Sequence, residues 1–445
     1  MQPNALLDAL LAEAGMSHAG LAAHVNQAGR TRGLALRYEH TAVSRWLKGQ
    51  RPRGQVPDLI CEVLGGRLHR PVALDDVGLG IPGQPGPHAT PIGGFVDRAT
   101  ALWRSDELDR PALLAVGAVT GTPAVIPVWE WENPPEDADV SRSGPHRIGP
   151  EHIEVLRAAR VHYELMYRRA GGVATRARIV RFLGSQTAPM LRGSYSDDLG
   201  RLLHRATGSL VAVAGICAYD SDAHGLAQRY FHQALRLAKA SGDRGLGAYV
   251  IALLVNQSLH LRDHRQAVAF AEAALRAAGR HTTPALAADL YAMQAKAYAR
   301  LGDTAAALGC IGKAEEAAGR IRPGTEPDET GYVQPGLVNV QVAEALLSLG
   351  DLGAAHAQAA EAASVPAHDR GRVHRLAMLC EIQLRQGEAD RAVASAAEMA
   401  ERAKGMESLR LRDRLRAVRE QLLSSGFAGA EETARLIDGA LRVPL

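Results

Sequence analysis

The sequence contains few aromatic residues, few cysteines and no long apolar run. Aromatic side chains make up 4% of the 445 residues, while alanine, leucine and arginine dominate, which favours a helical protein. The four cysteines stand far apart and form no C-x-x-C pair, so we expect neither a zinc site nor a disulfide framework. The longest apolar candidate, residues 210–219, is too short to span a bilayer. These absences predict a soluble helical protein with reduced, buried thiols.

The sequence also lacks a strong overall charge. It has 51 lysines and arginines against 48 acidic residues, so only local clusters of charge can indicate a nucleic-acid partner. The N-terminus has no basic region followed by an apolar core, so no signal peptide is expected. We therefore expect a cytoplasmic protein without a membrane partner.

The apolar spacing of residues 1–80 predicts a bundle of short helices. A first helix carries four leucines and ends near Gly15, and a second begins at Ser17 and ends at about Gly29. A third is expected at about 40–48, and a fourth ends at Gly65-Gly66. A bundle that presents its third helix at the surface is the minimal helix-turn-helix unit.

The third helix has two different faces. Val43, Trp46 and Leu47 fall together at helical spacing and form an apolar back. The opposite face is small, polar and cationic: Thr41, Ser44, Arg45 and Lys48. A helix that reads the major groove must pack its back on a neighbour while its front reaches base edges and phosphates. The pattern therefore predicts a DNA-recognition helix.

Positive charge is concentrated around this helix. Residues 30–53 hold seven cations and one anion, Glu39, a net charge of 7 − 1 = +6. Part of this charge lies in the connector 30–37, which is longer than the usual turn of three or four residues. A phosphate backbone is the obvious counterpart. The alternative is a solvated charged loop on a helical protein–protein module.

The segment Thr41-Ala42-Val43-Ser44-Arg45-Trp46-Leu47-Lys48-Gly49, followed by Pro52 and a leucine-rich helix, resembles the XRE (lambda-repressor/Cro-like) helix-turn-helix. That family commonly reads T-x-x-I-S-R-W-E-x-G, and the resemblance covers roughly residues 4–66. It implies base or phosphate contacts from Thr41, Ala42, Ser44 and Arg45, with Val43 and Trp46 structural. The full set of candidate DNA-binding residues is Arg30, Arg32, Arg37, Tyr38, His40, Thr41, Ala42, Ser44, Arg45, Lys48, Arg51 and Arg53.

Residues 81–147 are interpreted as a linker. Proline and glycine are dense from Gly80 to Pro87, a helix is expected at about 92–106, and residues 124–132 are predicted to be extended. The acidic run 132–139 is expected to be exposed. An alternative is that this run imitates phosphate and occupies the basic face of the N-terminal unit.

Residues 148–205 are predicted to form a basic helical segment that packs onto the remainder of the chain. Gly171-Gly172 divides it into two helices, and Glu164 is the one acidic residue within 157–181. The cations there are Arg157, Arg160, Arg168, Arg169, Arg176, Arg178 and Arg181. They indicate either a solvated face, or additional DNA contact, or a pocket for an anionic ligand.

Residues 206–445 repeat a pattern of small and apolar residues at spacings of 4 and 3. The first members are Ala227, Ala267, Ala307, Ala355 and Ala392, so the steps are 40, 40, 48 and 37 residues. Such units predict helical hairpins stacked into a superhelix, and they resemble tetratricopeptide repeats. In this class a concave groove receives a peptide, a protein or a small effector. The candidate groove residues are Asn256, His260, Tyr291, Gln294, Tyr298, Asn339 and Gln341, with Asn256 and Asn339 equally able to serve as interhelix hydrogen-bonding residues.

The sequence gives no positive sign of catalysis. His260 and His264 have the i, i+4 spacing of metal ligands beside Asp263, but a third ligand is missing nearby, so no metal or other cofactor is expected. The motifs of common hydrolases and nucleotide-binding enzymes are absent, so no enzymatic activity is expected.

The expected architecture is all-α, an N-terminal helix-turn-helix bundle followed by a tetratricopeptide-like superhelix. That combination resembles the XRE-type developmental and antibiotic-production regulators of actinomycetes. The resemblance implies a sequence-specific transcription factor that binds double-stranded DNA as a homodimer. One alternative is an interaction scaffold with weak DNA contact, and another is a receptor for a small anionic ligand.

Overall fold

The computed structural model describes residues 4–31, 34–68, 72, 74, 76–79, 92–108, 117–133, 137–322, 324–333 and 336–441. Two compact units divide the chain, one within residues 1–116 and one within 117–445. The protein is all-α, as the composition predicts. In the described residues, β-type pairing is limited to isolated bridges between Arg142 and Tyr195 and between Arg147 and Ser194.

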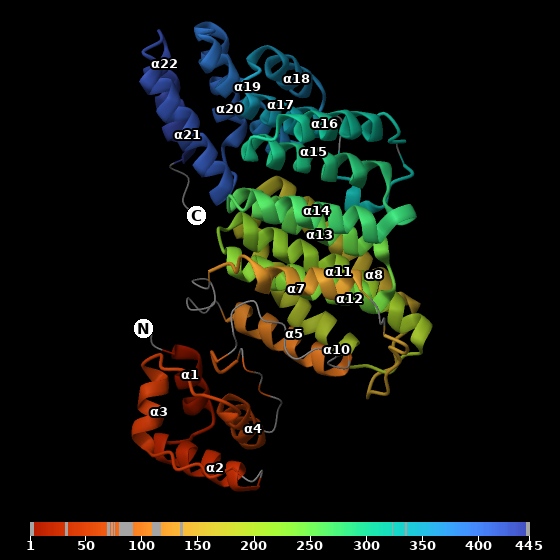
Figure 1. Ribbon diagram of the computed structural model, residues 1–445, viewed down its shortest axis with the longest axis vertical. Helices are drawn as coiled ribbons and strands as arrows, with labels where there is room; N and C mark the ends of the chain where they lie inside the picture. Colours follow the sequence, from red (N-terminus) through yellow and green to blue (C-terminus); the bar gives the residue numbers. More distant parts are fainter. Residues whose placement is uncertain are drawn as a thin grey trace. The chain divides into compact units, whose positions relative to one another are not determined.

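The first unit contains the predicted helical bundle. Its helices are α1 (Ala5–Glu13), α2 (His18–Thr31), α3 (His40–Leu47) and α4 (Val56–Leu68), followed along the chain by α5 (Ile92–Glu107) (Figure 1). The sequence predicted that α4 ends at Gly65-Gly66. The helix instead continues through both glycines to Leu68. The core of the bundle combines Leu7, Leu21, Val43 and Leu59, all fully buried. Each of α1 to α4 therefore contributes to one shared apolar core.

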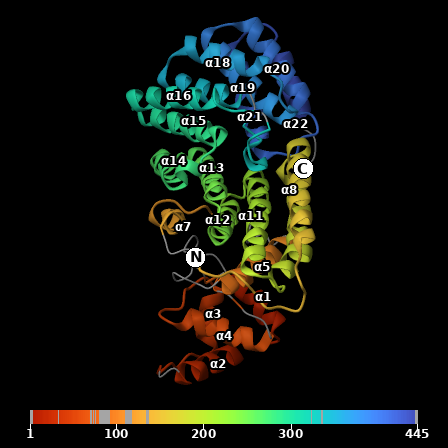
Figure 2. The ribbon, with the colours of Figure 1, turned by 90° about the vertical axis from the view of Figure 1, so that its right-hand side faces the viewer.

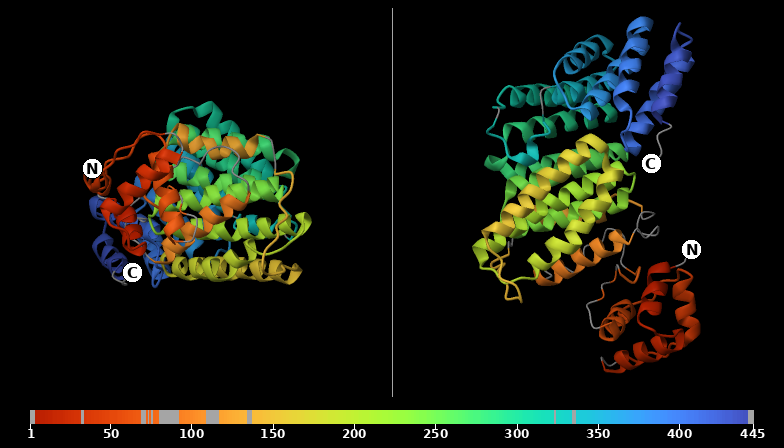
Figure 3. Two further views of the ribbon diagram at one scale, coloured as in Figure 1. Left: turned by 90° about the horizontal axis from the view of Figure 1, so that it is seen from below. Right: turned by 180° about the vertical axis from the view of Figure 1, so that it is seen from behind.

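The second unit is a succession of helical hairpins. Its α-helices are α7 (Thr122–Glu132), α8 (Pro150–Ala170), α9 (Gly172–Phe182), α10 (Ala188–Leu191), α11 (Asp197–Asp220), α12 (His224–Ser241), α13 (Arg244–His260), α14 (His264–Ala278), α15 (Pro284–Leu301), α16 (Thr304–Ala318), α17 (Leu337–Leu349), α18 (Leu352–Ser364), α19 (Asp369–Gln386), α20 (Ala389–Ala403), α21 (Leu409–Ser425) and α22 (Ala430–Leu441). Short turns of other helix types occupy Leu183–Thr187, Gly279–His281 and Asp328–Thr330. Each hairpin packs on the next, and α8 lies beside α11 (Figure 2). The last hairpin, α21 with α22, is the dark blue pair in the rear view (Figure 3).

The small-residue pattern lies on the second helix of each hairpin. The first alanines of the five sets, at 227, 267, 307, 355 and 392, are all fully buried, each on one of α12, α14, α16, α18 and α20. Alanine at these positions lets the two helices of a hairpin approach closely, because it carries no side chain beyond Cβ. The predicted helical-hairpin array is therefore present.

The turns inside the hairpins repeat with the same period. A residue with positive φ follows the first helix of each of the five hairpins from α11–α12 to α19–α20, at Asp222, Arg262, Gly302, Gly350 and Gly387. The steps between these positions are 40, 40, 48 and 37 residues, the same as for the buried alanines. The left-handed conformation stops the helix so that the chain can reverse, and glycine adopts it without steric cost. Aspartate and arginine occupy it in the first two hairpins.

Asp220 joins the beginning of the repeat unit to its end. Its carboxylate is fully buried and accepts hydrogen bonds from the Gly172 N–H (2.7 Å), from the Ser408 hydroxyl (2.8 Å) and from the Arg370 guanidinium. These partners come from α9, the start of α21 and α19, so one side chain holds together segments up to 188 residues apart. The array is thereby closed on itself.

The two glycines between α8 and α9 make this closure possible. Gly171 has φ = +96°, and a Cβ there would lie 2.2 Å from the Glu407 carbonyl oxygen. A Cβ on Gly172 would lie 2.5 Å from the Cys217 carbonyl oxygen. The predicted division at Gly171-Gly172 is confirmed, and its physical reason is the close approach of backbone from α11 and from the segment before α21.

The prediction of an extended segment at 124–132 is wrong, because α7 occupies it. Ala124, Val128 and Trp131 are buried at i, i+4, i+7, and α7 packs on α12 and α14. Gly247 leaves the space that the Trp131 ring fills, since a Cβ there would lie 2.0 Å from the indole nitrogen. Pro127 lies inside the helix without ending it. Burial of this apolar stripe outweighs the local preference for an extended chain.

The described part of the expected linker after residue 117 belongs to the second unit. The Gln228 side chain bonds both to the N–H and to the carbonyl of Val119, at 2.8 Å each, and the Gly121 N–H donates to Gln266. Residues 80–91, the proline- and glycine-rich break, lie outside the described residues. The structured region therefore begins earlier than the sequence indicated.

Among the described helices, α11 is long and apolar enough to cross a membrane by length and composition. Within its most apolar window, 83% is buried inside the protein. α11 packs against α8, α9, α12 and α13, which is the environment of a core helix.

Acid should destabilise the second unit through His204, a fully buried side chain of α11. Burial lowers the pKa of His204 to about 4, whereas an imidazole in the unfolded chain titrates near 6.5. Stability that is fully present above about pH 6.5 is therefore lost as the pH falls toward about 4, because the unfolded chain takes up the proton first. Between about pH 7 and about pH 5 we expect a loss of roughly 2 kcal/mol from this group.

Urea unfolding followed by circular dichroism at both pH values measures this loss. His204→Gln removes the titrating group, so the pH dependence of the variant should be smaller by roughly the same 2 kcal/mol. A variant with the same pH dependence as the parent chain would contradict the role assigned to His204.

Candidate nucleic-acid interface

α3 is held in place by its apolar back. Ala42, Val43 and Trp46 are buried in the core of the bundle, and the Trp46 ring meets the Tyr38 ring edge to face, with 5.1 Å between centroids. At the other end of the helix, the Asn4 N–H donates to the Leu47 carbonyl at 2.7 Å. The helix cannot rotate without breaking these contacts, so the residues that it turns outward are fixed.

The outward face of α3 is polar and cationic. His40, Thr41, Arg45 and Lys48 are exposed, and Ser44 is half-buried, with its hydroxyl donating to the His40 carbonyl at 3.1 Å. Ala42 is only 4% exposed, so its methyl group lies in the core and not on this face. The outward face of α3 is therefore built from His40, Thr41, Ser44, Arg45 and Lys48.

The connector before α3 is packed against the bundle. Leu34, Leu36 and Tyr38 are half-buried, and the residues between them are exposed, including Arg37. Asn26 of α2 clamps the Tyr38 backbone, accepting from its N–H and donating to its carbonyl, at 2.8 Å each. Leu36 lies against Gly29, where a Cβ would come within 2.5 Å. The alternation presents Arg37 to solvent just before α3.

The remaining predicted contacts differ in their surroundings. Arg30 and Arg53 are exposed, while Arg51 donates to the Leu79 carbonyl and so braces the end of the bundle. Arg32 lies outside the described residues. In the described part of the chain, no ion pair engages Arg37, Arg45 or Lys48. Their charges are available to an external anion.

The backbone N–H groups at the start of α3 have no capping side chain. Its N-cap, Glu39, makes no side-chain capping bond, so the first-turn amides have no side-chain partner there. Amides at a helix start point outward and attract anions, and DNA phosphates are anions of suitable size. This feature adds to the cationic side chains of the same helix.

The seven predicted groove residues of the second unit differ in burial and in partners, and they do not line one surface together. Gln294 and Gln341 are buried, and the Gln341 amide donates to Asp289 at 2.6 Å. The Asn339 amide donates to Gln358 of α18 at 2.9 Å, which is the interhelix role that the sequence left open. These three side chains are therefore buried or hydrogen-bonded within the second unit.

Two tyrosines of the same set turn toward second helices of the hairpins. The Tyr298 hydroxyl donates to Glu272 of α14 at 3.1 Å, and the Lys313 amine of α16 lies 5.6 Å from the Tyr291 ring centre. Asn256 is half-buried and His260 is exposed. Helical periodicity identifies polar positions but not the neighbour that each one faces, so the predicted groove is not assembled from these residues.

Sequence reasoning missed a set of charged residues inside the repeat unit. Lys296 of α15 pairs with Glu344 of α17 at 2.8 Å, and Arg300 pairs with the same carboxylate. Although burial acts in the opposite direction, the charges of Lys296, Arg414 and Arg300 hold the pKa of Glu344 well below its usual range. The signal in the sequence was the presence of charges on otherwise apolar helices.

Most arginines of 157–181 have partners within the chain. Arg160 is 5% exposed and pairs with Glu164 at 2.7 Å, and Arg168 pairs with the same carboxylate at 2.5 Å. Arg157 pairs with Glu154, and Arg176 and Arg181 also make interactions. This pairing reduces the positive charge that the segment could offer to a small anion.

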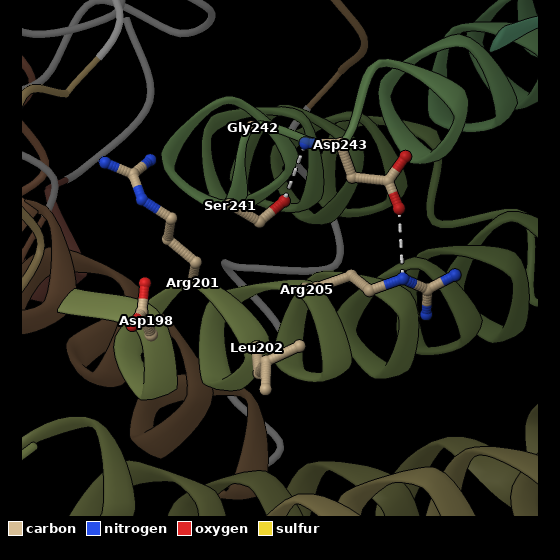
Figure 4. Close-up of a pocket in the computed structure, with 7 residues that line it drawn as sticks. All are labelled: Asp198, Arg201, Leu202, Arg205, Ser241, Gly242 and Asp243. Carbon is tan, nitrogen blue, oxygen red and sulfur yellow. Dashed lines mark hydrogen bonds and ion pairs between the residues drawn. The ribbon is translucent and has the colours of Figure 1, made fainter. Parts of the chain in front are cut away.

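A cleft of about 500 Å³ lies between α11 and the turn before α13 (Figure 4). Arg205 points toward Asp243 and bonds to it at 3.0 Å, and it also pairs with Glu329 at 3.0 Å. Arg201 pairs with Asp197 at 2.8 Å. Both arginines of the cleft are neutralised by carboxylates of the same unit, so the cleft offers little free positive charge.

The acidic run is bound by the second unit itself. Arg236 of α12 makes a two-pronged ion pair with Asp137, at 2.6 and 2.7 Å, and Arg276 of α14 pairs with Glu132 at 2.6 Å. These carboxylates are therefore already satisfied by arginines of the repeats. Two carboxylates that would have to imitate phosphate, those of Glu132 and Asp137, are therefore engaged within the second unit.

Comparison with known proteins singles out the N-terminal bundle. The family described as the SP15 N-terminal domain matches residues 7–80, a segment that runs from within α1 past the end of α4. Its description states a position in a protein and no activity. No curated protein matches the chain. The matched segment lies within the first unit.

Proposed function

We propose that the protein is a sequence-specific DNA-binding transcriptional regulator that uses α3 as its reading helix. The observation that carries the proposal is the outward face of α3, where His40, Thr41, Arg45 and Lys48 are exposed above a buried apolar back. The resemblance of this segment to the XRE helix-turn-helix agrees with it.

The side chains of this face divide into readers and anchors. Arg45, in the second turn of α3, can donate two hydrogen bonds to a guanine edge, and Thr41 and Ser44 can bond to neighbouring base edges. The exposed cations before and after this helix in the chain, Arg30, Arg37, Lys48 and Arg53, suit phosphate, and such contacts position the reader without selecting sequence. The two kinds of contact predict different responses to mutation.

The proposal includes a homodimer. One reading helix contacts few base pairs, and two copies that bind adjacent half-sites multiply a modest affinity into a high one. In this proposal the repeat unit dimerises or receives the regulatory peptide, protein or small ligand. The closure through Asp220 supports a rigid carrier for the DNA-binding bundle.

Arg45→Ala should weaken binding to the selected operator by about tenfold to a hundredfold, and binding to random DNA much less, because a base contact is lost. The operator is first selected from genomic fragments with the full-length chain. Fluorescence anisotropy at physiological salt then compares operator with random DNA. Arg320→Ala is the matched control, because Arg320 is an exposed arginine of the second unit with a long ion pair of 3.8 Å.

Lys48→Ala should instead weaken both DNAs alike and lower the salt dependence by about one phosphate contact. If the parent chain selects no operator, or if Arg45→Ala selects the same sites with the same affinity, the proposal fails. Weak, sequence-independent binding in every variant would favour an interaction scaffold.

A further inference from the structure

The turn between α11 and α12 lies beside the end of α13. Three side chains of types that commonly bind metal ions, one aspartate and two histidines, meet there. In Asp222, His224 and His260, one ligand atom of each residue lies within 4.8 Å of the others. Asp222 Oδ1 is 2.8 Å from His224 Nε2, and the two imidazole rings are 4.9 Å apart at their centres. The three side chains come from two neighbouring hairpins, so packing alone brings them together.

The next hairpin provides an internal comparison. His264 begins α14 as His224 begins α12, one repeat step of 40 residues earlier. There, however, the Asp263 carboxylate caps the start of α14, because its Oδ1 accepts a hydrogen bond from the Gln266 N–H at 3.1 Å. Arg300 stands 40 residues after His260 and pairs with Glu344. The same place in the next repeat therefore has neither a free carboxylate nor a second imidazole.

The first hairpin uses its acidic residue differently. The residue that precedes α12 is Ala223, which makes no side-chain cap, and the carboxylate belongs to Asp222 instead. Asp222 adopts φ = +60°, at the position that glycine takes in the hairpins α15–α16, α17–α18 and α19–α20. Its side chain faces His224 and remains 59% exposed. The Asp222 carboxylate therefore does not cap α12 and instead contacts the His224 imidazole.

We propose that Asp222, His224 and His260 form a binding site for a divalent transition-metal ion of the Zn²⁺ or Co²⁺ type. Imidazole nitrogen together with one carboxylate oxygen selects these ions over Mg²⁺ and Ca²⁺, which prefer oxygen ligands. Three protein ligands leave positions open for water or a further ligand. The exposed Asp222 gives the ion access from solvent.

The local chemistry suits such an ion. The site offers two imidazole nitrogens and one carboxylate oxygen, which are ligand types that Zn²⁺ accepts. Metal–ligand bonds of about 2.0–2.2 Å require ligand atoms about 3–3.5 Å apart, which rotation of the exposed Asp222 and His260 side chains can provide. The backbone is already fixed, because Gln257 donates to the His224 carbonyl at 2.8 Å.

Arg410 of α21 sets the strength of the site. Its guanidinium stacks on the Tyr219 ring at 4.0 Å, and that ring in turn lies against both imidazoles, with centroids 5.5 and 5.7 Å away. A divalent cation would be repelled by this charge. Binding of the metal should therefore loosen the contact between α21 and Tyr219.

The test uses the untagged full-length chain, freed of metal by a chelator. Isothermal titration with Zn²⁺ and the visible absorption of added Co²⁺ should show one site of micromolar affinity or tighter. His260→Ala and Asp222→Asn should each weaken binding at least about tenfold. His264→Ala is the matched control and should bind as the parent chain does, while Arg410→Gln should bind about threefold to tenfold more tightly.

Thermal unfolding without metal checks that each variant is folded, and added Zn²⁺ should raise the melting temperature of the parent chain but not of His260→Ala. The proposal is overturned if the parent chain binds no Co²⁺ up to about 1 mM. It is equally overturned if His260→Ala keeps full affinity, if His264→Ala loses as much affinity as His260→Ala, or if Arg410→Gln binds more weakly. This site does not depend on the proposed DNA binding.

Discussion

Trp46→Ala should unfold the N-terminal bundle and leave the repeat unit folded. Trp46 is 4% exposed and packs on Tyr38 at the centre of the bundle core. Truncating a buried tryptophan costs about 3–5 kcal/mol, because the lost contacts leave a cavity that the core does not refill. A bundle of this size has a total stability of roughly 4–10 kcal/mol, so the loss is a large fraction of the whole.

Hydrogen exchange of the full-length chain, followed by mass spectrometry, measures this effect region by region. Amides of α1 to α4 should lose protection, whereas those of α11 to α20 should keep it. Trp129→Ala is the matched control, because Trp129 is a tryptophan of α7 that is 56% exposed. Full protection of α1 to α4 in Trp46→Ala would show that the tryptophan does not hold the bundle together.

Asp220→Ala should destabilise the second unit by about 3–5 kcal/mol. The substitution leaves the Arg370 guanidinium buried without its anion, and it removes the acceptor of the Gly172 N–H and the Ser408 hydroxyl. An unpaired buried charge costs more than the ion pair itself contributes. The loss should be concentrated where α9, α19 and α21 meet.

Urea unfolding of the full-length chain gives the free energy, and hydrogen exchange gives its location. Asp413→Ala removes a carboxylate that is 60% exposed and pairs with Arg416 at 2.7 Å, so it should cost less than about 1 kcal/mol. The double variant Asp220→Ala with Arg370→Leu should recover part of the loss, because the orphaned charge is gone. Equal stability of Asp220→Ala and Asp413→Ala would remove Asp220 from its role in closure.

Comparing Trp46→Ala with Arg45→Ala distinguishes an effect on the folding of the bundle from an effect on DNA recognition. Trp46→Ala should abolish DNA binding together with the fold of the bundle, whereas Arg45→Ala should lower operator affinity in a folded protein. Arg45 is exposed and has no ion pair among the described residues, so its loss should leave the core intact. If both variants lose protection alike, the effect of Arg45→Ala on DNA says nothing about base contact.

Local periodicity was enough to predict most helices. Val43 and Trp46 of α3 and the alanines at 227, 267 and 307 are buried as their spacing indicated, and Leu47 is half-buried. Neighbours three and four residues apart share a helix face whatever the tertiary structure is, so this information is contained in the sequence. The same rule would have identified α7 from Ala124, Val128 and Trp131, had the β-branched residues and Pro127 between them carried less weight.

Contacts between distant segments could not be predicted in this way. His260 was compared with His264 because the two are close in sequence, yet the structure places it beside Asp222 and His224 of the preceding hairpin. Gln294 and Gln341 were assigned to a groove because they are polar, yet each is buried against a partner on another helix. A polar residue on a buried helix needs a partner, and the sequence does not say which one.

By itself, the sequence determined the all-α class, the separate N-terminal bundle and the hairpin period, because each follows from spacings within one or two helices. Tertiary structure alone decided how the array closes, through Asp220 and partners 48 to 188 residues away. It also decided which cations stay unpaired on α3 and which are neutralised, as Arg160 and Arg205 are. Pairing between charges depends on distances of a few ångströms, and these distances exist only once the helices have packed.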